Sequence, residues 1–143
     1  MRMCGIVAVT GYKKALPLLI NGLEKLEYRG YDSAGIAIIN SETNCISCNK
    51  AEGKLKNLIS NLNDHNIPGT VGIGHTRWAT HGKPEVKNAH PHTDSSGNIA
   101  VVQNGIIENF QDLKNKLEEE GIIFNSDTDT EVIPHLIQRE LNN

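Results

Sequence analysis

The feature that most restricts the fold is a short apolar run near the start of the chain that leads directly into a helical repeat. Cys4 to Val9 is apolar and ends at Thr10-Gly11, which is typical of a strand buried on both faces. From Lys13 onward, large aliphatic residues recur at helical spacing, which predicts an amphipathic helix packed on that strand. The chain therefore begins as a helix-covered strand.

The remaining sequence alternates strands and helices without a linker or an internal repeat. Two runs, 34–40 and 44–49, are joined by a short turn and predict an antiparallel hairpin. No GxGxxG motif follows the first strand, so a parallel doubly wound sheet is disfavoured. We expect a layered α/β (α+β) arrangement with two sheets packed face to face. The other expected elements are a helix at 55–62, strands at 71–75 and 99–102, a long polar loop at 83–97, and helices at 110–120 and from about 129.

Two residues bear on the start of the last helix. Thr128 and Glu131 stand at the spacing of a capping box, so the helix is expected to begin there. Pro134 is then expected past the first turn, where it would bend the helix or cost up to ~3 kcal/mol.

Length and composition indicate one globular domain over residues 1–143. The net charge of −3 is spread along the chain, which argues against nucleic acid or an anionic membrane as the main partner. No apolar segment has the length of a membrane span or a signal peptide, and three cysteines cannot form a complete disulfide framework. These features predict a cytoplasmic protein in a reducing compartment.

Two short patterns resemble fragments of metal sites. Cys45 and Cys48 have CxxC spacing, but no second such pair exists, and His90-Pro91-His92 lacks further ligands at short range. We expect the cysteines to be small residues of a strand or turn, the histidines to be exposed in a turn, and no metal site.

Cys4 is the candidate nucleophile. A cysteine with a free α-amino group carries its own general base, because that amine titrates at about pH 8. The mechanism therefore requires that Met1, Arg2 and Met3 are removed. Methionine is removed readily before a small residue, which fits Met3-Cys4 and not Met1-Arg2. We expect the active form to begin at Cys4.

Attack on an amide also needs donors for the developing oxyanion. Asn104-Gly105 follows a strand end, where a side-chain NH2 and a backbone N–H can point at one oxygen. Asn-Gly is equally the strongest hairpin signal, so a tight turn is the other interpretation of this dipeptide, and the two are compatible.

The segment after the strand at 71–75 has the character of a binding loop. Arg77 offers a planar fork of donors suited to a carboxylate, and Trp78 beside it could form a wall over a small ligand. Thr80 and His81 make this segment more polar than packing requires.

Two acidic residues could hold an ammonium group. Asp127 and Asp129 precede the last helix, where acidic residues are also favoured by the helix dipole. Arg29 and Asp32 lie in another polar cluster. An ion pair between these two residues would by itself give this cluster a structural role.

Five motifs in this order resemble the N-terminal class II glutaminase (glutamine amidotransferase) domain of the glutamine–fructose-6-phosphate aminotransferase (isomerizing) family. They cover nearly the whole chain, and two of them distinguish this family from the amidophosphoribosyltransferases, glutamate synthases and asparagine synthetases. The motifs are CGIV from Cys4, EYRGYDSAG from Glu27, GHTRWATHG from Gly74, NGIIEN from Asn104 and SDTDTE from Ser126.

The resemblance implies an N-terminal-nucleophile hydrolase fold, an αββα four-layer sandwich, here expected to be incomplete at its C-terminus. It implies Cys4 as nucleophile and Asn104 with the Gly105 N–H as oxyanion donors. The substrate-binding residues that it implies are Arg77, Thr80 and His81 for the glutamine α-carboxylate, Asp129 for the α-ammonium, Trp78 as a cover and Arg29 as an organiser of the pocket.

The implied reaction is hydrolysis of L-glutamine through a cysteinyl thioester to glutamate and ammonia, without a metal or cofactor. In the complete enzyme the ammonia converts fructose 6-phosphate to glucosamine 6-phosphate in a sugar isomerase domain, which this sequence lacks. Such a domain or chain is the implied partner, and assembly into an oligomer is left open. The alternative function is a non-catalytic glutamine-binding or regulatory module, or an inactive fragment, with a blocked cysteine.

Overall fold

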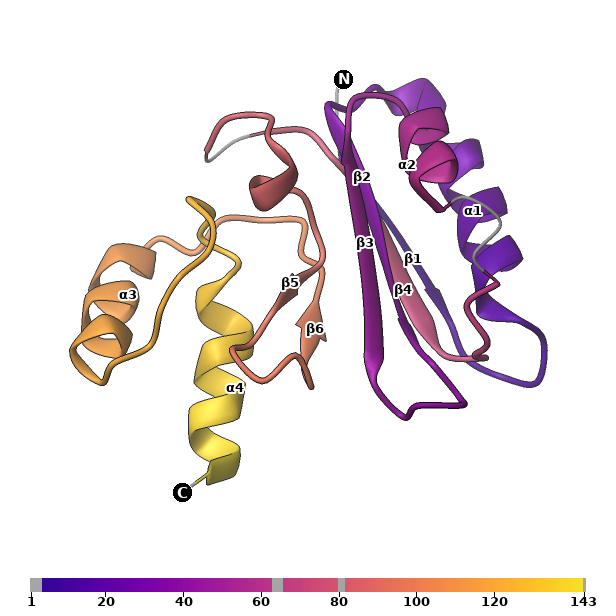
Figure 1. The fold of residues 1–143 in the computed structure, drawn as a ribbon. Coiled ribbons are helices and arrows are strands. Elements are labelled where there is room, and N and C mark those ends of the chain that lie inside the picture. Colours follow the sequence, from indigo (N-terminus) through magenta and orange to yellow (C-terminus); the bar gives the residue numbers. More distant parts are fainter. Residues whose placement is uncertain (1–3, 63–65, 80–81, 143) are drawn as a thin grey trace.

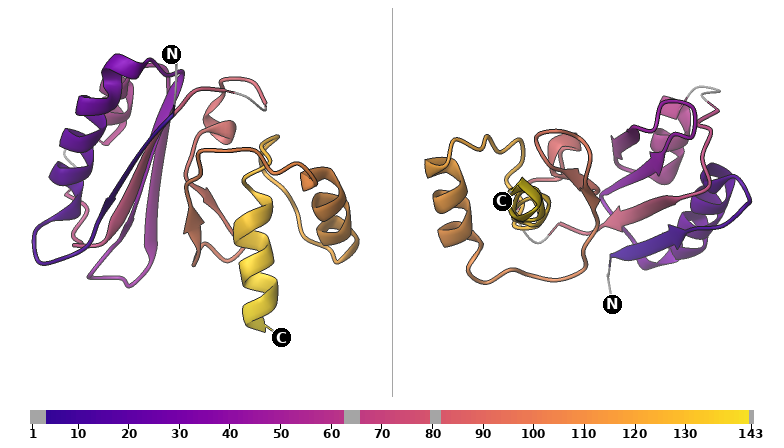
Figure 2. Two further views of the ribbon diagram at one scale, coloured as in Figure 1. Left: turned by 180° about the vertical axis from the view of Figure 1, so that it is seen from behind. Right: turned by 90° about the horizontal axis from the view of Figure 1, so that it is seen from below.

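The structure is a computed structural model that describes residues 4–62, 66–79 and 82–142. Helices α1 and α2 pack on one face of the main sheet, and β5 and β6 lie over its other face (Figure 1). Helix α4 packs on β5 and β6, with α3 beyond it, as Figure 2 shows from two further directions. The elements are β1 (Gly5–Val9), α1 (Ala15–Leu26), the 3-10 turn η1 (Glu27–Arg29), β2 (Ser33–Ile39), β3 (Ile46–Glu52), α2 (Leu55–Leu62), β4 (Gly72–Arg77), the 3-10 turn η2 (Val86–Asn88), β5 (His92–Thr93), β6 (Ala100–Val101), α3 (Phe110–Glu119) and α4 (Val132–Asn142).

The main sheet has the strand order β1-β4-β2-β3, and its neighbouring strands are antiparallel. The expected hairpin is confirmed, because β2 pairs with β3 and places Ala37 opposite Cys48. β5 and β6 form a separate antiparallel pair. The α/β class expected from the sequence and the αββα order of layers implied by the resemblance are both confirmed.

The core lies between the main sheet and its two covering helices. Leu19 and Leu23 of α1 are fully buried, and they fit because β4 has glycines beneath them. A Cβ at Gly72 would lie 2.9 Å from Leu19 Cδ1, and one at Gly74 would lie 3.2 Å from Leu23 Cδ1. Since each buried leucine contributes about 1.5–3 kcal/mol, the helical repeat read from the sequence is what anchors α1.

The two halves of the sandwich meet at Gly35 in the middle of β2. A Cβ at this position would lie 2.1 Å from the carbonyl oxygen of His90, closer than any side chain allows. Glycine therefore lets the buried segment around His90 and Pro91, which are joined by a cis peptide bond, lie directly on the sheet. Gly35 is also paired with His75 of β4, so this contact brings His90 beside His75.

Two expectations about the last helix are wrong. α4 begins at Val132, so Pro134 is its third residue and falls in the first turn, where the missing N–H has no acceptor within the helix. The capping box is not formed either. Thr128 Oγ1 instead lies 3.0 Å from Ser126 Oγ in the same loop and 2.8 Å from His92 Nε2, a buried partner from a distant segment.

The expected loop at 83–97 contains η2 and β5. Within the described residues, no helix is long and apolar enough to cross a membrane.

Candidate active site

A cavity of about 250 Å³ lies at the ends of β1 and β4 and is lined on another side by the loop that leads into α4. This volume is somewhat below that of pockets for drug-sized ligands, which span roughly 300–1,000 Å³, so the cavity fits a smaller molecule. Of the residues proposed from sequence, five line the cavity: Cys4, Arg77, Trp78, Gly105 and Asp129. The structure therefore brings together groups that lie up to 125 positions apart in the chain.

Cys4 is placed by the pairing of β1 with β4. Gly5 lies opposite Thr76 and donates its N–H to Thr76 Oγ1 at 3.1 Å, which fixes the residue before the strand. The Cys4 thiol consequently meets the backbone that follows β4. Its Sγ accepts the Trp78 N–H at 3.1 Å and lies 3.5 Å from the Trp78 carbonyl oxygen. The half-buried thiol is held at the cavity wall.

Asn104 and Gly105 lie next to the cysteine. Asn104 Nδ2 donates to the Cys4 carbonyl oxygen at 3.2 Å. The Gly105 N–H has no hydrogen-bond partner among the described residues. No hairpin forms here, because α3 is the next element after Gly105 in the described chain and no returning strand pairs with β6, but the backbone does bend at these two residues. The arrangement leaves N–H donors beside the thiol.

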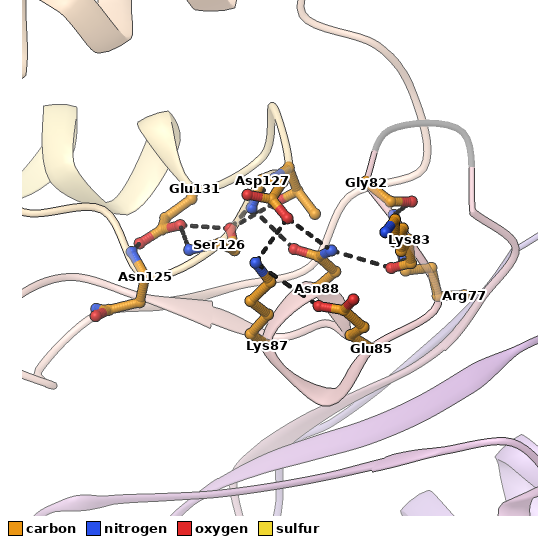
Figure 3. Close-up of polar contacts among 11 residues, drawn as sticks. Arg77, Gly82, Lys83, Glu85, Lys87, Asn88, Asn125, Ser126, Asp127 and Glu131 are labelled. Carbon is orange, nitrogen blue, oxygen red and sulfur yellow. Dashed lines mark hydrogen bonds and ion pairs between the residues drawn. The ribbon is translucent and has the colours of Figure 1, made fainter.

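Arg77 is the last residue of β4, and only 3% of it is exposed. Its guanidinium donates to the Lys83 carbonyl oxygen at 3.3 Å and to the Gly82 carbonyl oxygen at 3.5 Å (Figure 3). Burial lowers its pKa, while nearby Asp32, Cys4 and Asp129 raise it. Because arginine is protonated across the physiological range, this wall of the cavity is positively charged.

The two acidic candidates have different surroundings. Asp129 is buried, lines the cavity and accepts the Ile107 N–H at 2.7 Å through Oδ2. Asp127 is exposed and pairs with Lys87 Nζ at 2.8 Å, and its backbone N–H donates to Asn88 Oδ1 (Figure 3). Of these two residues only Asp129 lines the cavity, so the tertiary structure separates two residues that residue type and local pattern left equivalent.

The remaining sequence candidates have other outcomes. Thr80 and His81 lie outside the described residues, as do Met1 to Met3. Arg29 is half-buried in η1 and is not among the described residues that line the cavity. The expected Arg29–Asp32 ion pair is absent among the described residues. Asp32 Oδ2 instead accepts the Ala79 N–H at 2.6 Å, so it supports the backbone after Arg77.

Sequence reasoning missed the cavity-lining residues His75, His90, Gln103, Thr128 and Thr130. One signal was available for His75: in a strand, residues two apart share a face. A cavity residue at Arg77 therefore implies a side chain at His75 on the same face. The others come from loops, where periodicity gives no such guide.

The expectation that His90 and His92 are exposed is wrong. Both are buried, with ring centroids 4.7 Å apart, and His90 stacks on His75 at 4.3 Å. Burial lowers the pKa of His75 to about 4 and that of His92 to about 3, and it lowers the pKa of His90 further. The three rings are therefore neutral near pH 7. Among the described residues, no group of three or more His, Cys, Asp or Glu side chains is arranged to hold a metal ion.

Comparisons with known proteins identify the family of this chain. The glutamine amidotransferase domain family matches residues 47–140. Glutamine–fructose-6-phosphate aminotransferase (isomerizing) of Gloeobacter violaceus is 61% identical over 136 residues, which are 94% of this chain and 22% of that protein. The protein of the same name from Pyrococcus horikoshii is 56% identical over 97% of this chain and 23% of its own length. The chain thus spans about a fifth of the length of these relatives.

Two solved structures are also similar. Glutamine phosphoribosylpyrophosphate amidotransferase from B. subtilis superposes with a TM-score of 0.77 at 31% identity, over 94% of this chain and 29% of that one. A structure described as the allosteric regulatory enzyme of purine biosynthesis gives a TM-score of 0.79 at 33% identity with the same coverage. With a family match over most of the chain, an N-terminal-nucleophile type of fold and a cysteine at the cavity, this chain belongs to the glutamine amidotransferase domain family.

Proposed function

We propose that this chain is the glutaminase part of a glutamine–fructose-6-phosphate aminotransferase and hydrolyses L-glutamine to glutamate and ammonia. The observation that carries the proposal is the shared cavity of a thiol, a buried arginine and a buried carboxylate, at Cys4, Arg77 and Asp129. An amino acid presents the complementary set: an amide to attack, a carboxylate and an ammonium. The cavity volume of about 250 Å³ suits a ligand of this size.

Binding would use the charges at the cavity wall. The planar Arg77 fork holds the α-carboxylate in bidentate fashion, with help from Thr80 and His81. Asp129 Oδ2 already accepts the Ile107 N–H, which fixes the carboxylate and leaves Oδ1 for the α-ammonium. Trp78 covers the ligand, and Arg29 supports the pocket from outside the cavity lining.

The first chemical step is attack of the Cys4 sulfur on the side-chain carbonyl carbon of glutamine. With residues 1–3 removed, the Cys4 amine takes the thiol proton and returns it to the leaving nitrogen, so that ammonia departs and a γ-glutamyl thioester forms. The Asn104 side-chain NH2 and the Gly105 N–H stabilise the oxyanion of the tetrahedral intermediate. Water then attacks the thioester, releases glutamate and restores the thiol.

The fate of the ammonia belongs to the proposal as well. The relatives are named for the transfer of nitrogen to fructose 6-phosphate, and this chain spans about a fifth of their length. We propose that residues 1–143 form one glutaminase domain and that a sugar isomerase domain or chain supplies the acceptor site.

The test is release of glutamate and ammonia from L-glutamine by purified chain, with its N-terminus established by intact mass. Protein that begins at Cys4 should turn over glutamine, and Cys4→Ala should abolish turnover. Cys45→Ala removes an exposed thiol elsewhere and is the matched control that should keep it. Turnover by protein that retains Met1 would refute the α-amine mechanism. Thermal stabilisation by glutamine without ammonia release would instead support the non-catalytic binding module.

A further inference from the structure

His75 makes a contact that none of the catalytic steps above uses. It is fully buried in β4, and its Nε2 lies 2.8 Å from Asn104 Oδ1 and 3.1 Å from the Gln103 carbonyl oxygen. Its other ring nitrogen, Nδ1, is buried without a hydrogen-bond partner among the described residues. The histidine therefore directs one nitrogen at the residue proposed to stabilise the oxyanion.

The partners of His75 assign its tautomer. A backbone carbonyl oxygen can only accept, so the nitrogen that faces Gln103 O must carry the proton. Burial lowers the pKa of His75 to about 4, so the ring is neutral near pH 7 and Nδ1 is the bare nitrogen. His75 consequently presents a single N–H, shared between Gln103 O and Asn104 Oδ1.

That tautomer in turn orients the Asn104 amide. With Oδ1 held by the His75 N–H, Nδ2 must point the other way, and it donates to the Cys4 carbonyl oxygen at 3.2 Å. A flipped amide would set NH2 against the Nε2–H and Oδ1 against the Cys4 carbonyl oxygen, which replaces two hydrogen bonds by two repulsive contacts. A side-chain NH2 has two hydrogens. The second is left for the oxyanion.

The ring of His75 is itself held in place. It stacks on His90 with the ring centroids 4.3 Å apart and the planes inclined by 16°. His90 Nδ1 accepts the Gln103 N–H at 3.4 Å, and Gln103 Oε1 accepts from Thr130 Oγ1 at 2.8 Å. The backbone next to Asn104 is thus tied to both layers of the sandwich, so that the amide and its orienting ring cannot shift independently.

We propose that His75 is a positioning residue that fixes the side-chain amide of Asn104 with its NH2 toward the Cys4 reaction centre. This role rests on the proposed glutaminase function, but its structural part, the orientation of the Asn104 amide, does not depend on turnover.

The kinetic test uses His75→Phe, which keeps a stacking ring and removes the Nε2–H. Loss of an entire oxyanion donor costs roughly 10²–10³ in kcat, and a donor that is present but misoriented should cost about 10- to 100-fold, with KM for glutamine changed less than about twofold. His75→Gln offers an N–H at a similar reach and should recover most of kcat. Asn104→Ala should make a further His75→Phe change nearly silent, because the group that it orients is gone.

Loss of stability alone must be separated from this effect. Leu58→Ala removes a fully buried side chain from the core beneath α2 and should lower stability while kcat is retained. If His75→Phe lowers kcat no more than Leu58→Ala does, or if its effect adds fully to that of Asn104→Ala, the positioning role is wrong.

The structural test is ¹⁵N NMR of the unliganded protein. The His75 ring should show a protonated Nε2 and a bare Nδ1, and the Asn104 side-chain NH2 signals should move in His75→Phe and return in His75→Gln. A proton on Nδ1, or Asn104 signals unaffected by His75→Phe, overturns the proposal. Wild-type protein that releases no ammonia but shows these signals would refute the proposed function and leave the positioning role supported.

Discussion

Glu131 should dominate the acid sensitivity of this domain. Its side chain is 2% exposed and holds the loop before α4 from within. The carboxylate accepts the backbone N–H groups of Asn125 and Ser126, each at 2.7 Å, together with the Ser126 hydroxyl (Figure 3). His135 Nε2 lies 3.5 Å from it. The loop that Glu131 holds in this way places Thr128 and Asp129 at the cavity wall.

The hydrogen bonds determine the sign of the pH effect. Burial by itself raises the pKa of Glu131, but His135 and the donors of Asn125 and Ser126 outweigh it and bring the pKa from 4.5 to about 2. The unfolded chain therefore binds a proton at higher pH than the folded one. The stabilisation is complete above about pH 5 and is lost as the pH falls through the folded pKa of about 2.

The magnitude follows from the same values. Since one pKa unit corresponds to about 1.4 kcal/mol, a pKa lowered from 4.5 to about 2 stabilises the folded state by roughly 3 kcal/mol at neutral pH. Glu131→Gln removes this contribution and turns an NH2 group toward backbone N–H donors. The free energy of unfolding should therefore fall by about 3 kcal/mol at pH 7, a large part of the stability of a small domain.

The assay is urea unfolding followed by circular dichroism between pH 7 and pH 3. The difference between wild type and Glu131→Gln should shrink to less than half by about pH 3, because Glu131 of the unfolded wild-type chain is then largely protonated while the folded carboxylate is still mostly ionised. Glu118→Gln, the same change at an exposed carboxylate that pairs with half-buried Lys114, should leave the urea midpoint nearly unchanged throughout. A Glu131→Gln difference that is constant with pH would refute the assignment of the carboxylate as the ionised group.

Three further substitutions test the layer contact and the ligand charges. Gly35→Ala sets a Cβ 2.1 Å from the His90 carbonyl oxygen. The free energy of unfolding, measured in urea, should fall by at least about 2 kcal/mol. An unchanged urea midpoint would show that the layer containing His90 can move away from the main sheet. Arg77→Lys removes the planar fork and should raise KM for glutamine by about 10- to 100-fold, measured by glutamate release; an unchanged KM would exclude Arg77 as the carboxylate ligand. Asp129→Asn keeps an acceptor for the Ile107 N–H and should raise KM by about 10-fold with unchanged urea stability, whereas equal KM values would place the ammonium elsewhere.

Local patterns predicted the elements whose partners lie nearby in the chain. The apolar run from Cys4 to Val9 became β1, and the leucine repeat after Lys13 became α1. The expectation that this strand is buried on both faces is wrong, because β1 is an edge strand of the sheet and Ile6 is 41% exposed. The short turn after β2 was enough to predict its pairing with β3. For α1 and the hairpin, periodicity and turn length carry the information, because the buried face of a helix follows the spacing of its own apolar residues and a short turn brings adjacent strands together.

The same patterns failed where burial comes from distant segments. His90 and His92 form an unremarkable polar stretch in the sequence, and they are buried because Gly35 admits their backbone onto the sheet. The sequence predicted that Thr128 forms a capping box with Glu131, three residues away. Its hydroxyl instead lies next to the ring of the buried His92. Such competition between partners has no local signal.

The sequence by itself determined the residue types of a thiol-based amide reaction, an α/β domain to hold them, and a family resemblance that the comparisons support. Only the tertiary structure decided which of these residues share a cavity: it placed Asp129 inside and left Asp127 with Lys87 at the surface. It also showed that His75 and Asn104, 29 positions apart, form one hydrogen-bonded unit. The physical reason is that the ionisation, tautomer and orientation of a side chain depend on the burial and partners that distant segments supply, and these exist only when the layers have packed.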